Sequence, residues 1–336
     1  MTDSNHRWRR VLRHPIARMI TASLAMFLPL ALSFALMETL LPKGTGVAWS
    51  NLVAALVCVL GYRVYVKRVE RRAVTELSGS GAPAEWAAGA GLGVLLGLLT
   101  LAPLYVLGVY RIEGMGEGFQ LLKQIPEMLL VSVLEELLIR AVMFRIAEQA
   151  WGSQRALVFS TVLFVAAHLP GEISLVGVLV TAAASLAFTA AYQLSRRLWL
   201  PMGMHFAWNY LFSAVFSVPV SGHEANGWLR GSLIGPEWLS GAAYGIEAST
   251  MALLVWVVAD AILLHRVYSR GKFLPHLQRS TWGARSPKSS VASCQRLAPA
   301  LGSTKLAEKV APERPVCVLE AAVKKVDQLS RPDPTN

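Results

Sequence analysis

Cysteine and charge are both scarce in this chain of 336 residues. Its 3 cysteines, Cys58, Cys294 and Cys317, are far apart in the sequence and include no Cys-x-x-Cys pair. This spacing excludes a disulfide scaffold and a thiolate zinc site. Only 16% of the residues are charged, whereas an ordinary soluble domain has about 25%. The low charge argues against a water-soluble globular protein.

Three peptidase signatures are also absent. The sequence contains no His-Glu-x-x-His, no Gly-x-Ser-x-Gly and no Gly-x-Gly-Asp. The first signature places two histidines on one helix face around zinc, and the second exposes a nucleophilic serine on a sharp turn. The common zinc helix is therefore excluded, and serine and aspartyl membrane proteases are disfavoured.

Hydrophobic residues make up 54% of the chain and gather in long runs. A bilayer core about 30 Å thick is crossed by about 20 apolar residues of helix. The sequence therefore predicts an all-α protein, a polytopic transmembrane helix bundle with about eight spans in the lipid bilayer. These spans are expected at about 17–40, 49–64, 86–109, 125–147, 155–169, 174–194, 199–217 and 240–264.

Basic residues are divided unevenly between the two sides of these spans. The formal net charge is +11. The loops on one side hold only four basic residues, and all the others outside the spans fall on the opposite side. Basic loops stay in the cytoplasm, so we expect both termini there. An apolar chain with basic loops does not indicate nucleic acid as a partner. The sparse side holds Lys43, Arg111, Lys123 and Arg230.

Composition divides the chain into three parts. Residues 1–16 form a basic cytoplasmic N-terminus, residues 17–265 the transmembrane region, and residues 266–336 a basic tail with many prolines. The first span is expected to be an uncleaved anchor because it is too long for a signal peptide and has no clear cleavage site. The tail is expected to be cytoplasmic and mostly disordered, since its composition cannot build a core.

The fourth predicted span carries charged side chains at a depth where each costs several kcal/mol. Glu135, Glu136 and Arg140 interrupt an otherwise apolar stretch. On a helix, Glu136 and Arg140 are four residues apart on one face and can pair, whereas Glu135 points about 100° away. We expect the pair to support a site in which Glu135 faces a cavity as a general base. Taken alone, the cluster also fits a structural ion pair or a proton relay.

Two later spans add further polar groups. His168 ends the fifth span, and His205 and Asn209 are four residues apart on one face of the seventh. A carboxylate and an imidazole can activate water, while a second imidazole and the Asn209 amide can donate hydrogen bonds to an oxyanion. Alternatively, Glu135, His168 and His205 are candidate ligands for zinc, with an open position for water. The residues alone leave both chemistries open.

The order of these motifs resembles that of the CPBP family of CAAX proteases, bacteriocin-processing and Abi proteins, which includes the Rce1-like prenyl endopeptidases. The similarity is strong over about 125–215 and weaker over about 60–265. The sequence before His205 and Gly245-Ile246-Glu247 near the last span are also similar to the family. The matching motifs are Glu135-Glu136-x-x-x-Arg140, Phe164-x-x-x-His168 and His205-x-x-x-Asn209.

This resemblance implies a bacterial intramembrane endopeptidase, in the inner or plasma membrane, that hydrolyses a membrane-associated, prenylated or peptide substrate. It implies that Glu135 and His168 activate water, that the third motif binds the oxyanion, and that Glu136 and Arg140 support the site. Because the family is described both as metalloproteases and as glutamic proteases, a divalent metal such as zinc stays open. Two alternatives are a non-proteolytic immunity or scaffold protein of the same fold and a proton-coupled transporter.

The position of Glu135 in its span predicts where the site opens. Under the eight-span topology, Glu135 lies about 10 residues, or about 15 Å, from the outer surface. We therefore expect the site to open towards the cell exterior or periplasm. In the eighth span, Glu247 is expected to pair within the bundle, whereas Asp260 is expected to reach water at the cytoplasmic end.

Overall fold

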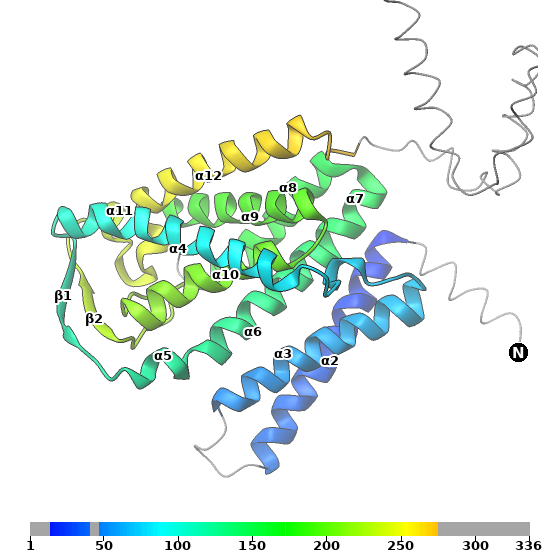
Figure 1. Ribbon diagram of the computed structural model, residues 1–336, viewed down its shortest axis with the longest axis horizontal. Helices are drawn as coiled ribbons and strands as arrows, with labels where there is room; N and C mark the ends of the chain where they lie inside the picture. Colours follow the sequence, from blue (N-terminus) through cyan, green and yellow to red (C-terminus); the bar gives the residue numbers. More distant parts are fainter. Residues whose placement is uncertain (1–13, 41–46, 172, 275–336) are drawn as a thin grey trace, which may run out of the picture. The chain divides into compact units, whose positions relative to one another are not determined.

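The computed structural model describes residues 14–40, 47–171 and 173–274. The predicted tail from residue 275 onward and residues 1–13 of the basic N-terminus lie outside this part. The described chain is mainly helical, as the sequence predicts (Figure 1). Its α-helices are α2 (Pro15–Leu40), α3 (Val47–Tyr65), α4 (Ala82–Val106), α5 (Phe119–Lys123), α6 (Ile125–Glu136), α7 (Arg145–Trp151), α8 (Ser153–His168), α9 (Leu175–Ser195), α10 (Trp199–Tyr210), α11 (Glu237–Ser240) and α12 (Thr250–Ser269).

Three π-helices and four 3-10 turns complete the helical elements of the described chain. All three π-helices continue longer helices without a break: η1 extends α3, η3 joins α6 to α7, and η5 extends α10. The π-helices are η1 (Val66–Glu70), η3 (Leu137–Phe144) and η5 (Leu211–Val215), and the 3-10 turns are η2 (Thr75–Leu77), η4 (Leu169–Gly171), η6 (Ala242–Tyr244) and η7 (Ile246–Ala248).

Four helices in the described part are long and apolar enough to cross a bilayer, namely α2, α4, α9 and α12. The other predicted spans also form helices, but these are shorter or contain a π-helix. The predicted start of the eighth span is wrong. Residues 241–249 form turns because Gly241 and Gly245 adopt φ values of 82° and 95°. Helix α12 begins at Thr250, after the N-cap residue Ser249, whose hydroxyl accepts a hydrogen bond from the Ala252 N–H at 3.1 Å.

A two-stranded ribbon, which the sequence does not predict, interrupts the helical pattern. Strands β1 (Tyr110–Met115) and β2 (Leu229–Leu233) are antiparallel, with an irregular register between Ile112 and Gly114. The Tyr110 hydroxyl donates to the Phe216 carbonyl at 2.9 Å. This bond fixes the ribbon to Phe216, the residue that follows η5. Several residues between Phe216 and β2 line the candidate site described below.

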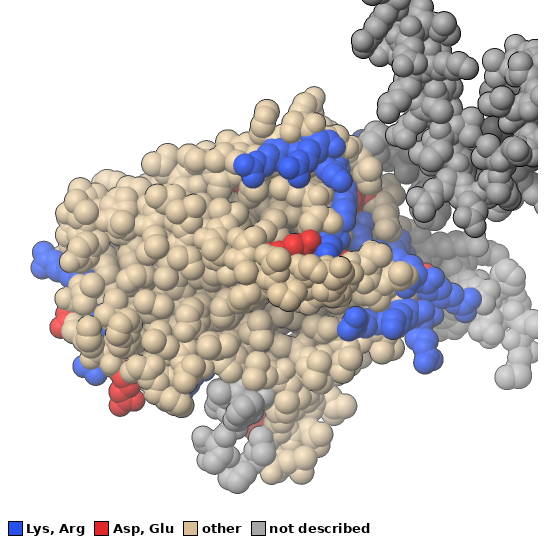
Figure 2. All heavy atoms as spheres, in the orientation of Figure 1, with Lys and Arg blue, Asp and Glu red and all other residues tan. Residues whose placement is uncertain are grey.

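Successive long helices alternate in direction, so the loops with most of the basic residues meet at one end of the bundle. Lys and Arg side chains gather there on the visible face (Figure 2). We call this the basic end, defined by Arg18, residues 66–78, residues 145–155, residues 196–199 and residues 266–274. Hydrogen bonds cross between these loops, as from Arg196 to the Lys272 carbonyl at 3.1 Å and from Trp199 to the Ser78 carbonyl at 2.8 Å.

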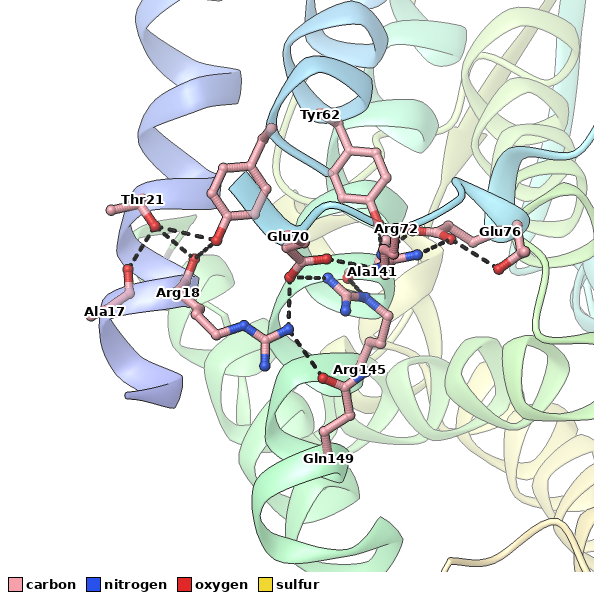
Figure 3. Close-up of polar contacts among 12 residues, drawn as sticks. Ala17, Arg18, Thr21, Tyr62, Glu70, Arg72, Glu76, Ala141, Arg145 and Gln149 are labelled. Carbon is pink, nitrogen blue, oxygen red and sulfur yellow. Dashed lines mark hydrogen bonds and ion pairs between the residues drawn. The ribbon is translucent and has the colours of Figure 1, made fainter. Parts of the chain in front are cut away.

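An ion-pair network holds the basic end together (Figure 3). The carboxylate of Glu70 in η1 accepts from Arg18 of α2 at 2.7 Å, from Arg72 at 2.7 Å and from Arg145 of α7 at 2.9 Å. Arg72 also donates to Glu76 at 2.6 Å. Glu70 therefore joins α2, η1 and α7 at one buried point.

The network predicts sensitivity to acid. Burial alone would raise the pKa of Glu70, but the charge of Arg145 and bonds from Arg145, Arg18 and Arg72 outweigh it and lower the pKa to about 2. A carboxyl with a lowered folded pKa stabilises the protein fully above its unfolded pKa of about 4.3, and this contribution is lost as pH falls through the folded pKa.

We therefore expect the unfolding temperature in detergent to fall between about pH 4.3 and pH 2. Glu70→Gln should lower the unfolding temperature at pH 7 and flatten its pH dependence in this window. Glu113→Gln, on the exposed side of β1, is the matched control. An unchanged acid profile in Glu70→Gln would contradict the assignment.

The backbones of helices α4 and α10 are in direct contact. A Cβ built on Gly93 would lie 2.3 Å from the Met204 carbonyl oxygen, and one built on Gly203 would lie 2.2 Å from the Trp86 carbonyl oxygen. Small residues at four-residue spacing permit such contacts in membrane bundles. Gly89, Gly93 and Gly97 have this spacing: Gly89 and Gly93 contact the α10 backbone, whereas Gly97 contacts the Leu211 side chain of η5. Helix α10 therefore rests directly on α4.

Gly93→Leu is expected to separate these helices. Since the added side chain would overlap the α10 backbone, we expect a loss of about 1–3 kcal/mol or more in the free energy of unfolding. The matched control is Gly91→Leu, because a Cβ on Gly91 meets nothing within 4 Å. Thermal unfolding of both variants in detergent measures the difference, and equal stability of the two would contradict the close contact.

Candidate active site

A cavity of about 650 Å³ brings four of the predicted residues together. Glu135 lies near the end of α6, His168 at the end of α8, and His205 and Asn209 on one face of α10, and all four side chains line the cavity. Three helices that are separate in sequence therefore converge on one space. Its volume falls within the range of about 300–1,000 Å³ that is usual for ligand sites.

The Glu136–Arg140 pair lies behind the cavity wall. Both side chains are 0% exposed, and Arg140 donates to a Glu136 oxygen at 3.0 Å. Arg140 also donates to the Ser185 carbonyl of α9 at 3.1 Å, and its guanidinium lies over the rings of Phe164 and Phe188 at 4.8 and 5.2 Å. The pair forms as the four-residue spacing predicts, and it links η3 to α9.

His205 is held by Glu136, a contact that the sequence analysis does not predict. Its Nδ1 lies 2.9 Å from Glu136 Oε1, so Nδ1 carries the proton and donates to the carboxylate. Its ring stacks on Phe188 with a centroid distance of 4.8 Å and an interplanar angle of 14°. These contacts fix the orientation of the ring and direct Nε2 towards Glu135.

Glu135 faces the cavity. Its side chain is 29% exposed, and its Oε2 lies 3.9 Å from His205 Nε2, which is too long for a direct hydrogen bond. This buried oxygen has no hydrogen-bond partner among the described residues. A carboxylate oxygen with unused acceptor capacity beside an imidazole is suited to general-base chemistry.

His168 presents one ring nitrogen to the same space. Its Nδ1 lies 2.8 Å from the Phe164 carbonyl, so Nδ1 donates and Nε2 is left as the acceptor. The Phe164 ring also contacts the imidazole with a centroid distance of 4.5 Å. The first residue of the Phe164-x-x-x-His168 motif therefore fixes both the tautomer and the position of the second.

Comparison with known families gives one match. The family described as type II CAAX prenyl endopeptidase Rce1-like matches residues 118–211. This segment is therefore similar to the Rce1-like family. It contains every motif residue of the cavity and runs from α5 to the first residue of η5. No curated protein and no solved structure matches the chain.

The motif residues of the cavity do not form a metal site in the part of the chain that the structure describes. The described residues include no group of three or more His, Cys, Asp and Glu side chains placed to hold a metal ion. Of the predicted zinc ligands, Glu135 and His205 approach each other, whereas His168 does not complete a group with them. We therefore derive no step through a metal.

Besides the motif residues, the cavity is lined by α5, the start of α6 and the segment between η5 and β2. These elements lie at the end of the bundle opposite the basic end (Figure 1). Their lining residues are mostly polar, in contrast to the apolar faces of the long helices, and Asn51 of α3 adds a further polar side chain. The polar residues of the three elements are Gln120, Lys123, Gln124, Glu127, Ser221, His223, Glu224 and Asn226.

Proposed function

We propose that this protein is an integral membrane endopeptidase that uses Glu135 to activate water against a peptide bond. The observation that carries the proposal is the approach of Glu135 Oε2 to His205 Nε2 across 3.9 Å, on the wall of a cavity of about 650 Å³. The protease character of the Rce1-like family supports the same reaction class.

The mechanism begins with water. Glu135 accepts one water proton, assisted by the acceptor nitrogen of His168, and the hydroxide attacks the peptide carbonyl carbon. The His205 Nε2–H and the Asn209 amide donate hydrogen bonds to the resulting oxyanion. When the tetrahedral intermediate collapses, the carbon–nitrogen bond breaks and the proton on Glu135 passes to the leaving amine.

The buried charges fit this division of roles. Because His205 Nδ1 donates to Glu136, Nε2 can donate to an oxyanion only when both ring nitrogens carry a proton. A cationic ring is electrostatically complementary to the two carboxylates beside it, Glu135 and Glu136. A protonated Nε2 is the form that an oxyanion donor needs.

We also propose that the chain crosses the membrane eight times and that the cavity opens outwards. Loops rich in Lys and Arg face the cytoplasm, and the polar part of the cavity lining lies at the end opposite the basic end. In a background with Cys294 and Cys317 replaced by serine, a membrane-impermeant maleimide applied to intact cells is expected to label Glu224→Cys. Arg68→Cys should react only after permeabilisation. The reverse pattern would contradict the orientation.

The reaction is tested by cleavage in water labelled with ¹⁸O. Purified protein in lipid vesicles is incubated with a mixture of membrane-associated, prenylated and plain peptides, and the products are analysed by mass spectrometry. Hydrolysis places one ¹⁸O atom in each new carboxyl group, and vesicles without the protein give the background. Absence of labelled products from every peptide class, with correctly folded protein, would reject the endopeptidase assignment.

A further inference from the structure

We propose that Glu247 is a positioning residue that holds residues 217–227 as one wall of the active-site cavity. The role of this wall in substrate binding rests on the proposed function, whereas the anchoring of the wall by Glu247 does not. Glu247 lies in η7, just before α12 and outside the segment that matches the Rce1-like family.

Both carboxylate oxygens of Glu247 accept hydrogen bonds from other parts of the chain. Oε2 accepts from the Ser221 N–H at 2.7 Å and from the Ser221 hydroxyl at 2.9 Å. Oε1 accepts from the Trp208 indole N–H at 2.7 Å. One carboxylate therefore joins the wall segment to α10 at the residue before Asn209. Bonds to an ionised acceptor are about twice as strong as neutral ones.

The wall segment needs such an anchor because it is a strained turn. Ser217 and Ser221 both have φ of 50°, a conformation that costs a non-glycine residue about 1 kcal/mol or more. Its internal bonds are few: Val220 and His223 exchange two backbone bonds of 3.2 and 2.9 Å, and Ser217 accepts from the Gly227 N–H at 2.7 Å. The anchor at Ser221 compensates for this strain.

This segment supplies much of the cavity lining away from the reacting groups. Val220, Ser221, Gly222, His223 and Glu224 all line the cavity. Glu135 and His205, in contrast, are positioned by α6 and by Glu136, which Glu247 does not touch. Loss of the anchor is therefore expected to weaken substrate binding more than the chemical step.

Glu247 itself is placed to support the site and not to react. It lines a second, smaller cavity of about 30 Å³ together with His168, His205 and Asn209. Since its oxygens already accept three hydrogen bonds from Ser221 and Trp208, it acts on the reaction through these two residues.

Kinetics of peptide cleavage test the effect on binding. Glu247→Gln replaces one acceptor oxygen with an NH₂ group that cannot accept, so we expect KM to rise about tenfold with kcat within about twofold. Ser221→Ala keeps the backbone bond and should give a smaller rise. The double variant should be no worse than Glu247→Gln, because both changes break one contact. A loss confined to kcat, or fully additive effects, would overturn the positioning role.

A labelling experiment tests the anchor without any need for catalysis. In the full chain with Cys294 and Cys317 replaced by serine, Val220→Cys reports on the wall segment and Met128→Cys on α6, and both positions are buried in the cavity lining. We expect Glu247→Gln to speed maleimide labelling of Val220→Cys about tenfold and to leave Met128→Cys unchanged. Equal rates at Val220→Cys, or equal acceleration at both sites, would overturn the proposal. If no peptide is cleaved but the labelling result holds, only the proposed function fails.

Discussion

Replacing Glu135 with glutamine is expected to lower kcat for peptide cleavage by about 10³-fold, within the usual contribution of a general base. Glutamine has the same shape but cannot take a proton from water. Its effect on folding should be small, because Glu135 is partly exposed and its Oε2 has no hydrogen-bond partner in the described chain. Initial rates and thermal unfolding of the same preparation separate the two effects.

The matched control for Glu135→Gln is the same substitution at the neighbouring residue, Glu136. Glu136→Gln weakens the contacts to both Arg140 and His205, so it should lower the unfolding temperature as well as the activity. Activity of Glu135→Gln within tenfold of the unmodified protein would reject Glu135 as the base. Equal loss of stability in both variants would contradict the separate roles of the two carboxylates.

Arg140→Leu is expected to cost about 3–5 kcal/mol of the free energy of unfolding, because it removes the guanidinium that pairs with a fully buried carboxylate. Glu136 is fully buried, so water cannot replace the lost guanidinium. The Ser185 carbonyl and hydroxyl also lose their donor. Denaturation in mixed detergent micelles measures the loss.

A double variant distinguishes the charge effect from lost packing. Arg140→Leu combined with Glu136→Leu removes both charges, and apolar replacement of a buried pair is often neutral or stabilising. We expect it to recover most of the stability. It should not recover activity, because the Nδ1 of His205 then has no carboxylate partner. A double variant as unstable as Arg140→Leu would show that packing of the guanidinium, and not its charge, is decisive.

Local spacing and hydropathy were sufficient to predict part of this site. The pairing of Glu136 with Arg140 follows from a separation of four residues on a helix. The apolar runs predict the helices because each run must satisfy its backbone within a bilayer. The bond from His205 to Glu136 joins residues 69 positions apart, and no local pattern encodes it. Phe188 and Ser185 were missed for the same reason.

In the eighth predicted span, an error in the helix boundaries led to a wrong prediction for the exposure of Asp260. The sequence suggests that Asp260 reaches water near the helix end, but this prediction is wrong, since the residue is 8% exposed. Helix α12 begins later and continues to Ser269, which moves Asp260 away from the end. Hydropathy does not detect the two glycine turns that delay the start, because apolar residues surround them.

Two of the three π-helices of the described chain lie next to the candidate site and have a consequence for how the ends of each helix are oriented. η3 follows Glu135 and Glu136 directly, and η5 begins two residues after Asn209. A π turn holds extra residues compared with an α turn, and each residue of an α-helix turns the chain by about 100°. The cavity half and the basic-end half of the α6–α7 helix are therefore set at different rotations about a shared axis. Glu135 can face the cavity while Arg145 faces Glu70, an arrangement that a regular α-helix with the same sequence would not give.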